Sequence, residues 1–183
     1  MSSDAGEALK ARSQVAVGEI AAALGHLDDA DLEALIARLL QANRIFLSGQ
    51  GRSGLMLRAI GVRLMHIGLC IFVAGESNTP AIGPGDLLIA VSSSARTATT
   101  LEHLAVARRA GAETALITAV AAGDDLADCR LWLPVRCKVA TVQHAGSLFE
   151  QSVLVLGDCL AWYVQQAKAV GDDALSARHA NLQ

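Results

Sequence analysis

The sequence predicts an α/β protein with a doubly wound parallel sheet, and three observations lead to that class. First, 52% of its 183 residues are hydrophobic but only 3% are aromatic, so the core is built from Ala, Val, Leu and Ile, which suits buried parallel strands. Second, from residue 44 onward, short apolar runs alternate with helical patterns. Third, two unusual loops, 48–54 and 92–97, directly follow such runs, where sheets of this class bind ligands.

Two helices are expected before the first strand. Helical periodicity runs from about Gly6 to Gly25, and Asp28 or Asp29 can cap a second helix that ends near Gln41. Because two helices cannot bury both of their faces alone, we expect them to pack on the sheet or to reach a neighbouring subunit.

The remaining chain supplies five strands and the helices between them. Strands are expected at 44–47, 69–73, 87–91, 114–117 and 131–135, and helices at 55–67, from 98 to about 110, and at 144–168. The polar end, 172–183, is expected to form a tail or a short helix. No linker or repeat interrupts the pattern, so we expect one domain over 1–183, with helices in 1–42, an α/β core in 44–168 and the tail.

Composition excludes several classes of function. A net charge of −3, from 15 basic and 18 acidic residues, gives no footprint for nucleic acid. The first residues do not resemble a signal peptide and no apolar run reaches transmembrane length, so we expect a cytoplasmic protein without a membrane partner. The four cysteines are scattered without metal-ligand spacing. Three of them lie in or near apolar runs, so we expect buried free thiols rather than a redox or zinc site. We also expect no metal site and no cofactor.

The first candidate loop is rich in glycine. Gly51, Arg52 and Ser53 lie between a strand and a helix, where glycines let backbone amides approach a ligand. The spacing matches neither the dinucleotide fingerprint nor a nucleotide P-loop. A purely structural glycine turn remains an equal alternative.

The second candidate loop is rich in hydroxyl groups. Ser92, Ser94, Arg96 and Thr97 precede a helix, and together they would cradle a phosphate monoester. The alternative is helix capping, which needs only one hydroxyl and leaves the others unexplained.

Two further residues are candidates for acid–base chemistry. Glu150 lies in an apolar segment, where a carboxylate can serve as a base near neutrality; the alternative is a solvated helix-terminal acid. His66 ends an amphipathic helix, where a packed histidine or a helix-dipole partner is the more common role. His26, His103 and His144 have no special context.

Several segments, in the same order along the chain, resemble the SIS (sugar isomerase) domain and, within it, the 6-phospho-3-hexuloisomerase family. The matching motifs are G-x-G-R-S-G at 49–54, R-L-M-H-x-G at 63–68, G-E-x-x-T-P at 75–80, Q-x-x-G-x-x-F-E at 143–150 and R-H-A-N-L at 178–182. The resemblance spans nearly the whole chain.

The resemblance implies a three-layer, flavodoxin-like α/β/α sandwich with a five-stranded parallel sheet, and a homotetramer with active sites at subunit contacts. It implies interconversion of D-arabino-hex-3-ulose 6-phosphate and fructose 6-phosphate, in the ribulose monophosphate pathway that fixes formaldehyde. By position, Ser53, Ser92, Ser94 and Thr97 would hold the phosphate. Glu150 would be the base, His66 would assist proton transfer, and His179 would close over a site.

The 92–97 loop departs from the family pattern S-G-S-G-E-T. Ser93 and Ala95 replace glycines, and Arg96 replaces an acid. The substitutions restrict the backbone and add positive charge, which favours phosphate but shifts its pose. Two alternatives therefore stay open: an isomerase for another sugar phosphate, and a SIS module that binds without turnover.

Overall fold

The computed structural model describes residues 2–121, 125–135 and 137–181 of the chain. Within these ranges five parallel strands lie in the order β2-β1-β3-β4-β5. The elements are α1 (Ser2–Leu24), α2 (Asp29–Gln41), β1 (Ile45–Gly49), α3 (Gly51–Ile67), β2 (Ile71–Val73), β3 (Leu87–Val91), α4 (Ala98–Arg109), β4 (Glu113–Thr118), β5 (Cys129–Trp132), α5 (Ser147–Ala167) and α6 (Asp172–Ala177). The predicted fold class is confirmed.

Some predicted boundaries were wrong, and each error has a local cause. β5 ends at Trp132 rather than Val135, because Pro134 has no N–H to donate to a neighbouring strand. α3 begins at Gly51 rather than Leu55, so the glycine-rich loop itself forms the first helical turn. The second helix is capped as predicted, since the Asp28 carboxylate accepts from the backbone N–H groups of Ala30 and Asp31.

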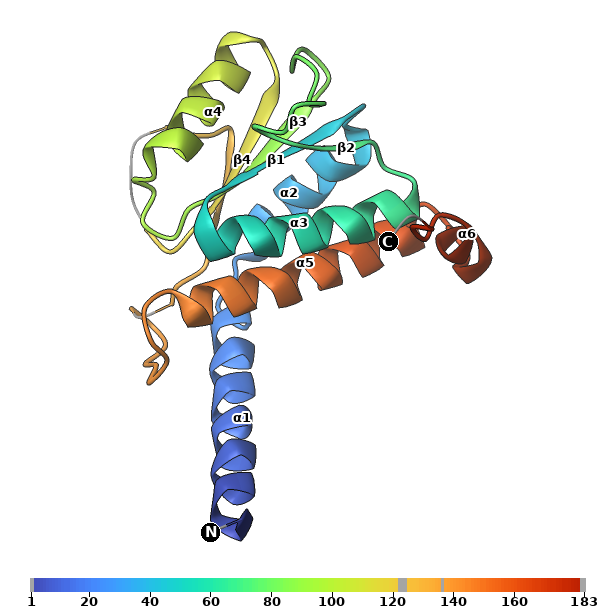
Figure 1. Cartoon of the computed structure of the whole chain (residues 1–183). Coiled ribbons are helices and arrows are strands. Elements are labelled where there is room, and N and C mark those ends of the chain that lie inside the picture. Colours follow the sequence, from blue (N-terminus) through green and yellow to red (C-terminus); the bar gives the residue numbers. More distant parts are fainter. Residues whose placement is uncertain (1, 122–124, 136, 182–183) are drawn as a thin grey trace.

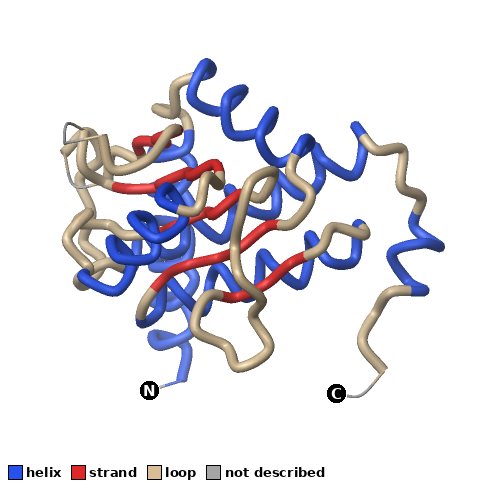
Figure 2. The backbone as a smooth tube through the Cα atoms, turned by 90° about the horizontal axis from the view of Figure 1, so that it is seen from above, coloured by secondary structure: helices blue, strands red, loops and turns tan. Residues whose placement is uncertain are grey.

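Helices cover both faces of the sheet, which lies between them when the molecule is viewed from above (Figure 2). On one face, α4 packs through Leu104 and Ala107 against Phe46, Leu88 and Leu116. On the other face α2, α3 and α5 enclose the larger core, in which Phe149 and Leu64 are each 1% exposed. Alternate strand residues thus point to opposite faces, and helices pack on both, as expected for a parallel sheet.

α3 and α5 run side by side in the same direction (Figure 1), because glycines let them approach closely. A side chain at Gly157 of α5 would place its Cβ 2.2 Å from Ile60 of α3. This packing brings the beginnings of the two helices together and, at the opposite end, brings their last turns together.

α1 leaves the body of the molecule as a long projecting helix (Figure 1). Its last turns pack on the core through Ala23, which is fully buried, while Leu9, Val15 and Val17 are exposed. α1 therefore presents apolar side chains that this chain does not cover.

An ion pair ties together the amino ends of β1 and β3. The Arg44 guanidinium donates to both carboxylate oxygens of Asp86, at 2.9 and 2.6 Å, and the Gly83 N–H donates to the same carboxylate. The side chain of Asp86 is 2% exposed and that of Arg44 is 35% exposed. The hydrogen bonds from Arg44 hold the pKa of Asp86 below its usual value.

We expect Asp86→Asn to lower the free energy of unfolding by about 2 kcal/mol at pH 7. The loss is smaller than that from breaking a fully buried ion pair, because Arg44 is partly exposed. Because the folded-state pKa is lowered, the carboxylate stabilises the fold above its unfolded pKa of about 3.9, and that contribution disappears as the pH falls through the lower folded-state value. Urea unfolding from pH 7 down to pH 2.5 measures both effects. Glu102→Gln, which breaks the exposed pair with Arg109, is the matched control and should change little. A variant Asp86→Asn as stable as wild type at pH 7 would contradict the prediction.

The four cysteines are free thiols, as predicted, but the prediction that they are buried was wrong for most of them. Cys129 on β5 is buried, but Cys70, Cys137 and Cys159 are exposed on this chain. Cys159 lies on the outer face of α5, although the sequence around it is apolar, because that face is not covered here. Among the described residues, no helix combines the length and hydrophobicity needed to cross a membrane.

Candidate functional site

The two loops singled out in the sequence meet at the carboxyl edge of the sheet. β1 and β3 are hydrogen-bonded neighbours, and Gly49 at the end of β1 pairs in register with Val91 at the end of β3. The order β2-β1-β3 places the change of direction in strand order at this point, where doubly wound sheets bind ligands.

The glycines of the first loop have two different roles. Gly51 has φ = +58° with open space where a Cβ would stand, so the backbone is accessible to a ligand. Gly54 is required by packing, since a Cβ there would stand 2.5 Å from the carbonyl oxygen of Gly49. The N-cap residue Gln50 makes no side-chain cap, which leaves the first N–H groups of α3 available to an anion.

The second loop turns its hydroxyl groups toward one another. The Ser92 and Thr97 hydroxyl oxygens are 3.0 Å apart, and Ser92 is buried, while Ser94 and Arg96 are exposed. Thr97 is the N-cap residue of α4, yet its side chain makes no capping hydrogen bond. Capping therefore does not account for these hydroxyl groups, and the start of α4 remains open to an anion.

Ala95 has a backbone conformation that is suited to glycine, although the residue carries a side chain. Its φ is +50°, in the left-handed region that costs a residue with a side chain about 1 kcal/mol or more. The restriction expected at Ser93 does not arise, because only Ala95 in this loop has a positive φ. The loop thus carries strain at one position.

We expect Ala95→Gly to raise the free energy of unfolding by up to about 1 kcal/mol, the relieved strain being partly offset by the freer unfolded chain. Ala59→Gly on the exposed side of α3 is the matched control and should lower it by about 1 kcal/mol. Thermal unfolding of both variants measures the difference. Equal destabilisation by both changes would show that Ala95 is not strained.

Glu150 stands beside the first loop, on the first turn of α5. The Nε of Arg52 donates to Glu150 Oε2 at 2.6 Å, and the side chain of Glu150 is 14% exposed while that of Arg52 is 62% exposed. The sequence suggested an isolated carboxylate, but the structure shows an ion pair between the starts of α3 and α5. Glu150 is therefore held at a fixed place with one face open beside the loop.

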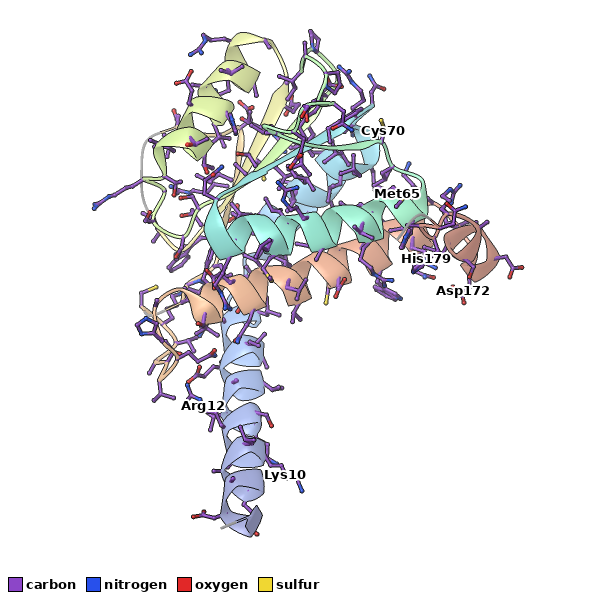
Figure 3. The ribbon with its side chains drawn as sticks, in the orientation of Figure 1. Lys10, Arg12, Met65, Cys70, Asp172 and His179 are labelled. Carbon is purple, nitrogen blue, oxygen red and sulfur yellow. The ribbon has the colours of Figure 1, made fainter. Side chains whose placement is uncertain are left out.

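His66 and His179 lie together, but far from Glu150 in the same chain. Their rings stack with centroids 5.0 Å apart at the far end of α3 (Figure 3, His179 and the neighbouring Met65 labelled), and His66 is 8% exposed. The Nε2 atom of His66 has no hydrogen-bond partner among the described residues. The fourteen residues from Arg52 to His66 span about 20 Å of helix, so one chain does not bring these groups to its own Glu150.

Arg178 explains why the tail motif and the α3 motif occur together. Its guanidinium donates to the His66 carbonyl at 3.2 Å and lies against Gly68, where a Cβ would be 3.1 Å from Arg178 Cζ. Gly68 also has φ = +100° and ends α3. The tail is thus docked on the end of α3 through Arg178 and His179. Leu182, the last residue of the tail motif, lies outside the described residues.

Two polar contacts near the site involve residues that the sequence analysis did not select. The hydroxyl oxygen of Ser48, which is buried near the end of β1, lies 2.8 Å from Nδ1 of His103 on α4. Glu19 on α1 binds the segment before α5. Neither carries a local signal, because the partners lie 55 and more than 120 residues apart in the sequence.

The doubly wound parallel sheet, the two loops with uncapped helix N-termini at its carboxyl edge and the acid beside the first loop define an α/β protein with a candidate site for an anionic ligand. Residues 38–153 match the SIS domain family, and the chain belongs to that family.

More specific relatives share almost the full length of the chain. A 3-hexulose-6-phosphate isomerase of Mycobacterium gastri is 37% identical over 174 residues, covering 90% of this chain and 86% of the relative. A second protein of that name, from Bacillus subtilis, is 29% identical over 91% of this chain and 95% of its own. A crystal structure of a Methanococcus jannaschii protein, which infers the same function for it, superposes with a TM-score of 0.83 at 27% identity, covering 94% of this chain and 99% of that one. The resemblance drawn from the motifs is confirmed.

Proposed function

We propose that this protein is a 3-hexulose-6-phosphate isomerase that interconverts D-arabino-hex-3-ulose 6-phosphate and fructose 6-phosphate. The observation that carries the proposal is the position of Glu150, held by Arg52 beside the first of two neighbouring loops that offer N–H and hydroxyl groups to a phosphate. The names of the full-length relatives support it.

In this proposal the phosphate on C6, remote from the reacting carbons C2 and C3, is the anchor. Ser53, Ser92, Ser94 and Thr97, with the backbone of Gly51, bind the phosphate oxygens at the starts of α3 and α4, and the exposed cations Arg52 and Arg96 add attraction. Anchoring the phosphate holds the reacting carbons beside the base, so proton transfer becomes a step within one enzyme–substrate complex.

The chemistry needs one base and one proton carrier. The Glu150 carboxylate removes the proton from C2 of the 3-ketose, the C2–H electron pair forms the C2=C3 bond, and O3 takes up a proton to give the enediol. The proton on O2 then leaves as its electrons re-form a carbonyl at C2, and Glu150 returns its proton to C3. His66, with His179 beside it, carries the proton between O2 and O3.

Because His66 lies about 20 Å along α3 from Arg52, we propose that each site takes His66 and His179 from a second copy of the chain. Two surfaces support an oligomer, for which we propose a homotetramer. α1 exposes the apolar side chains Leu9, Val15 and Val17. A groove of about 550 Å³ between α2 and α5 is lined by Leu32, Ile36, Val155, Trp162 and Tyr163. Trp162 is 60% exposed on the single chain, which is unusual for so large an apolar side chain.

The direct test is the formation of fructose 6-phosphate from enzymatically generated hexulose 6-phosphate, followed with a coupled dehydrogenase. Turnover comparable with that of typical enzymes, from one to a thousand per second, is the expected result. If no turnover occurs while sugar phosphates still raise the melting temperature, the site serves another sugar phosphate or only binds, and the proposal fails.

The reaction would act beside a hexulose-phosphate synthase in the ribulose monophosphate pathway, in the cytoplasm. We infer this setting from the substrate pair alone.

A further inference from the structure

The structure assigns to Glu19, on the N-terminal helix α1, the role of a positioning residue for the active site, an inference that rests on the proposed isomerase function. The Glu19 carboxylate accepts three hydrogen bonds from one short segment, residues 141–143. The donors are the Thr141 hydroxyl at 2.7 Å, the Gln143 side-chain amide at 2.8 Å and the Val142 backbone N–H at 3.2 Å.

The contact is specific in its chemistry. All three donors meet one carboxylate, an arrangement that an amide or an alkyl side chain could not replace, because only a carboxylate offers acceptors alone. Bonds to Thr141 and then Gln143 lower the pKa of Glu19 below its usual value, so the side chain is ionised throughout the neutral range. Arg12 lies about two helical turns before Glu19 on the same side of α1. It points toward this segment (Figure 3), and its guanidinium donates to the Val142 carbonyl at 3.1 Å.

The segment held by Glu19 leads directly to the proposed base. Gln143 is 8% exposed, and the Gln143 N–H donates to the Thr141 hydroxyl at 3.0 Å, which closes the segment on itself. Two residues later Ala145 has φ = +48°, a strained conformation that persists only where the surroundings enforce it. Gly146 then begins the turn into α5, and a Cβ there would lie 3.4 Å from Oε1 of Glu150.

The geometry therefore connects α1 to the active site through the main chain. Glu19 fixes 141–143, this segment fixes the turn at 145–146, and the turn sets the first helical turn of α5, where Arg52 holds Glu150. Without the carboxylate, Glu150 stays in the chain but loses its defined place relative to the two phosphate loops. A displacement of about 1 Å is enough to cost catalysis heavily.

The test compares Glu19→Gln with Glu7→Gln, an exposed acid on the same helix, in the full chain. We expect Glu19→Gln to remain folded, to exchange the amides of residues 139–147 faster, and to lower kcat/KM about tenfold or more. Competition by inorganic phosphate should be unchanged, because the phosphate loops do not contact Glu19. Glu7→Gln should match wild type in every measurement.

The outcomes separate this inference from the proposed function. Unchanged exchange in 139–147, or faster exchange with unchanged kcat/KM, would overturn the role of Glu19. If Glu19→Gln does not fold, Thr141→Val is the second variant, because it removes one of the three donors. It should show smaller changes in the same direction in amide exchange and in kcat/KM, and wild-type values of both would overturn the inference. Absence of turnover in the wild-type chain would refute the isomerase proposal, while the exchange measurement would still decide whether Glu19 holds the segment.

Discussion

Replacing Glu150 by Gln should lower kcat of isomerisation by about a thousandfold while sugar phosphate still binds. General-base catalysis contributes factors of about 10² to 10⁴, and here the base acts on a weakly acidic C–H bond, which loses its proton slowly without one. Gln keeps the size of the side chain and loses only the ability to take the proton. Steady-state kinetics in the coupled assay measures kcat, and displacement of bound sugar phosphate by inorganic phosphate measures binding.

The control for this change is Glu113→Gln. Glu113 accepts from Nε of Arg38 at 3.0 Å, the same type of pair as Glu150 with Arg52, but at the amino edge of the sheet. We expect its activity to stay within about twofold of wild type, because an exposed pair contributes little. Turnover retained in Glu150→Gln would remove Glu150 as the base; a similar loss in both variants would point to stability rather than chemistry.

The placement of the two loops was predictable from the sequence because it depends only on the order of strands. A glycine turn and a hydroxyl cluster that each follow a strand must lie at the same edge of a parallel sheet, and the pairing of β1 with β3 made them neighbours. The closeness of α3 and α5 at Gly157 was not predictable, since the residue that it faces, Ile60, is 97 positions away.

The side-chain partners of the site residues could not be predicted from the sequence either, because they lie far away along the chain. Glu150 reads as an isolated acid in an apolar run, but its partner Arg52 comes from another helix. Glu19 looks like any acid on a helix, and only the fold brings it to residue 141. The exposed Cys159 was misjudged because apolar residues around it face solvent on this chain, a property of packing rather than of composition.

The position of His66 leads to the second large effect, which concerns the assembly. Within one chain, about 20 Å of helix α3 separates His66 from Arg52 and its partner Glu150. His66→Gln and Glu150→Gln should each abolish most activity, although the two substituted side chains lie at opposite ends of α3. If a site takes its base from one chain and its histidines from another, mixing the two inactive variants creates some sites with both wild-type groups.

Co-refolding equal amounts of the two variants should therefore restore about a quarter of wild-type activity, because each site draws its two groups from chains paired at random. The control mixes Glu150→Gln with the double variant Glu150→Gln/His66→Gln, which can form no complete site and should stay inactive. Full activity in His66→Gln alone would remove His66 from the mechanism. No recovery, with mixed oligomers demonstrated by native mass spectrometry, would mean that each chain completes its own site, and α3 would then have to be rearranged in the active protein, because the straight helix described here keeps the two groups apart.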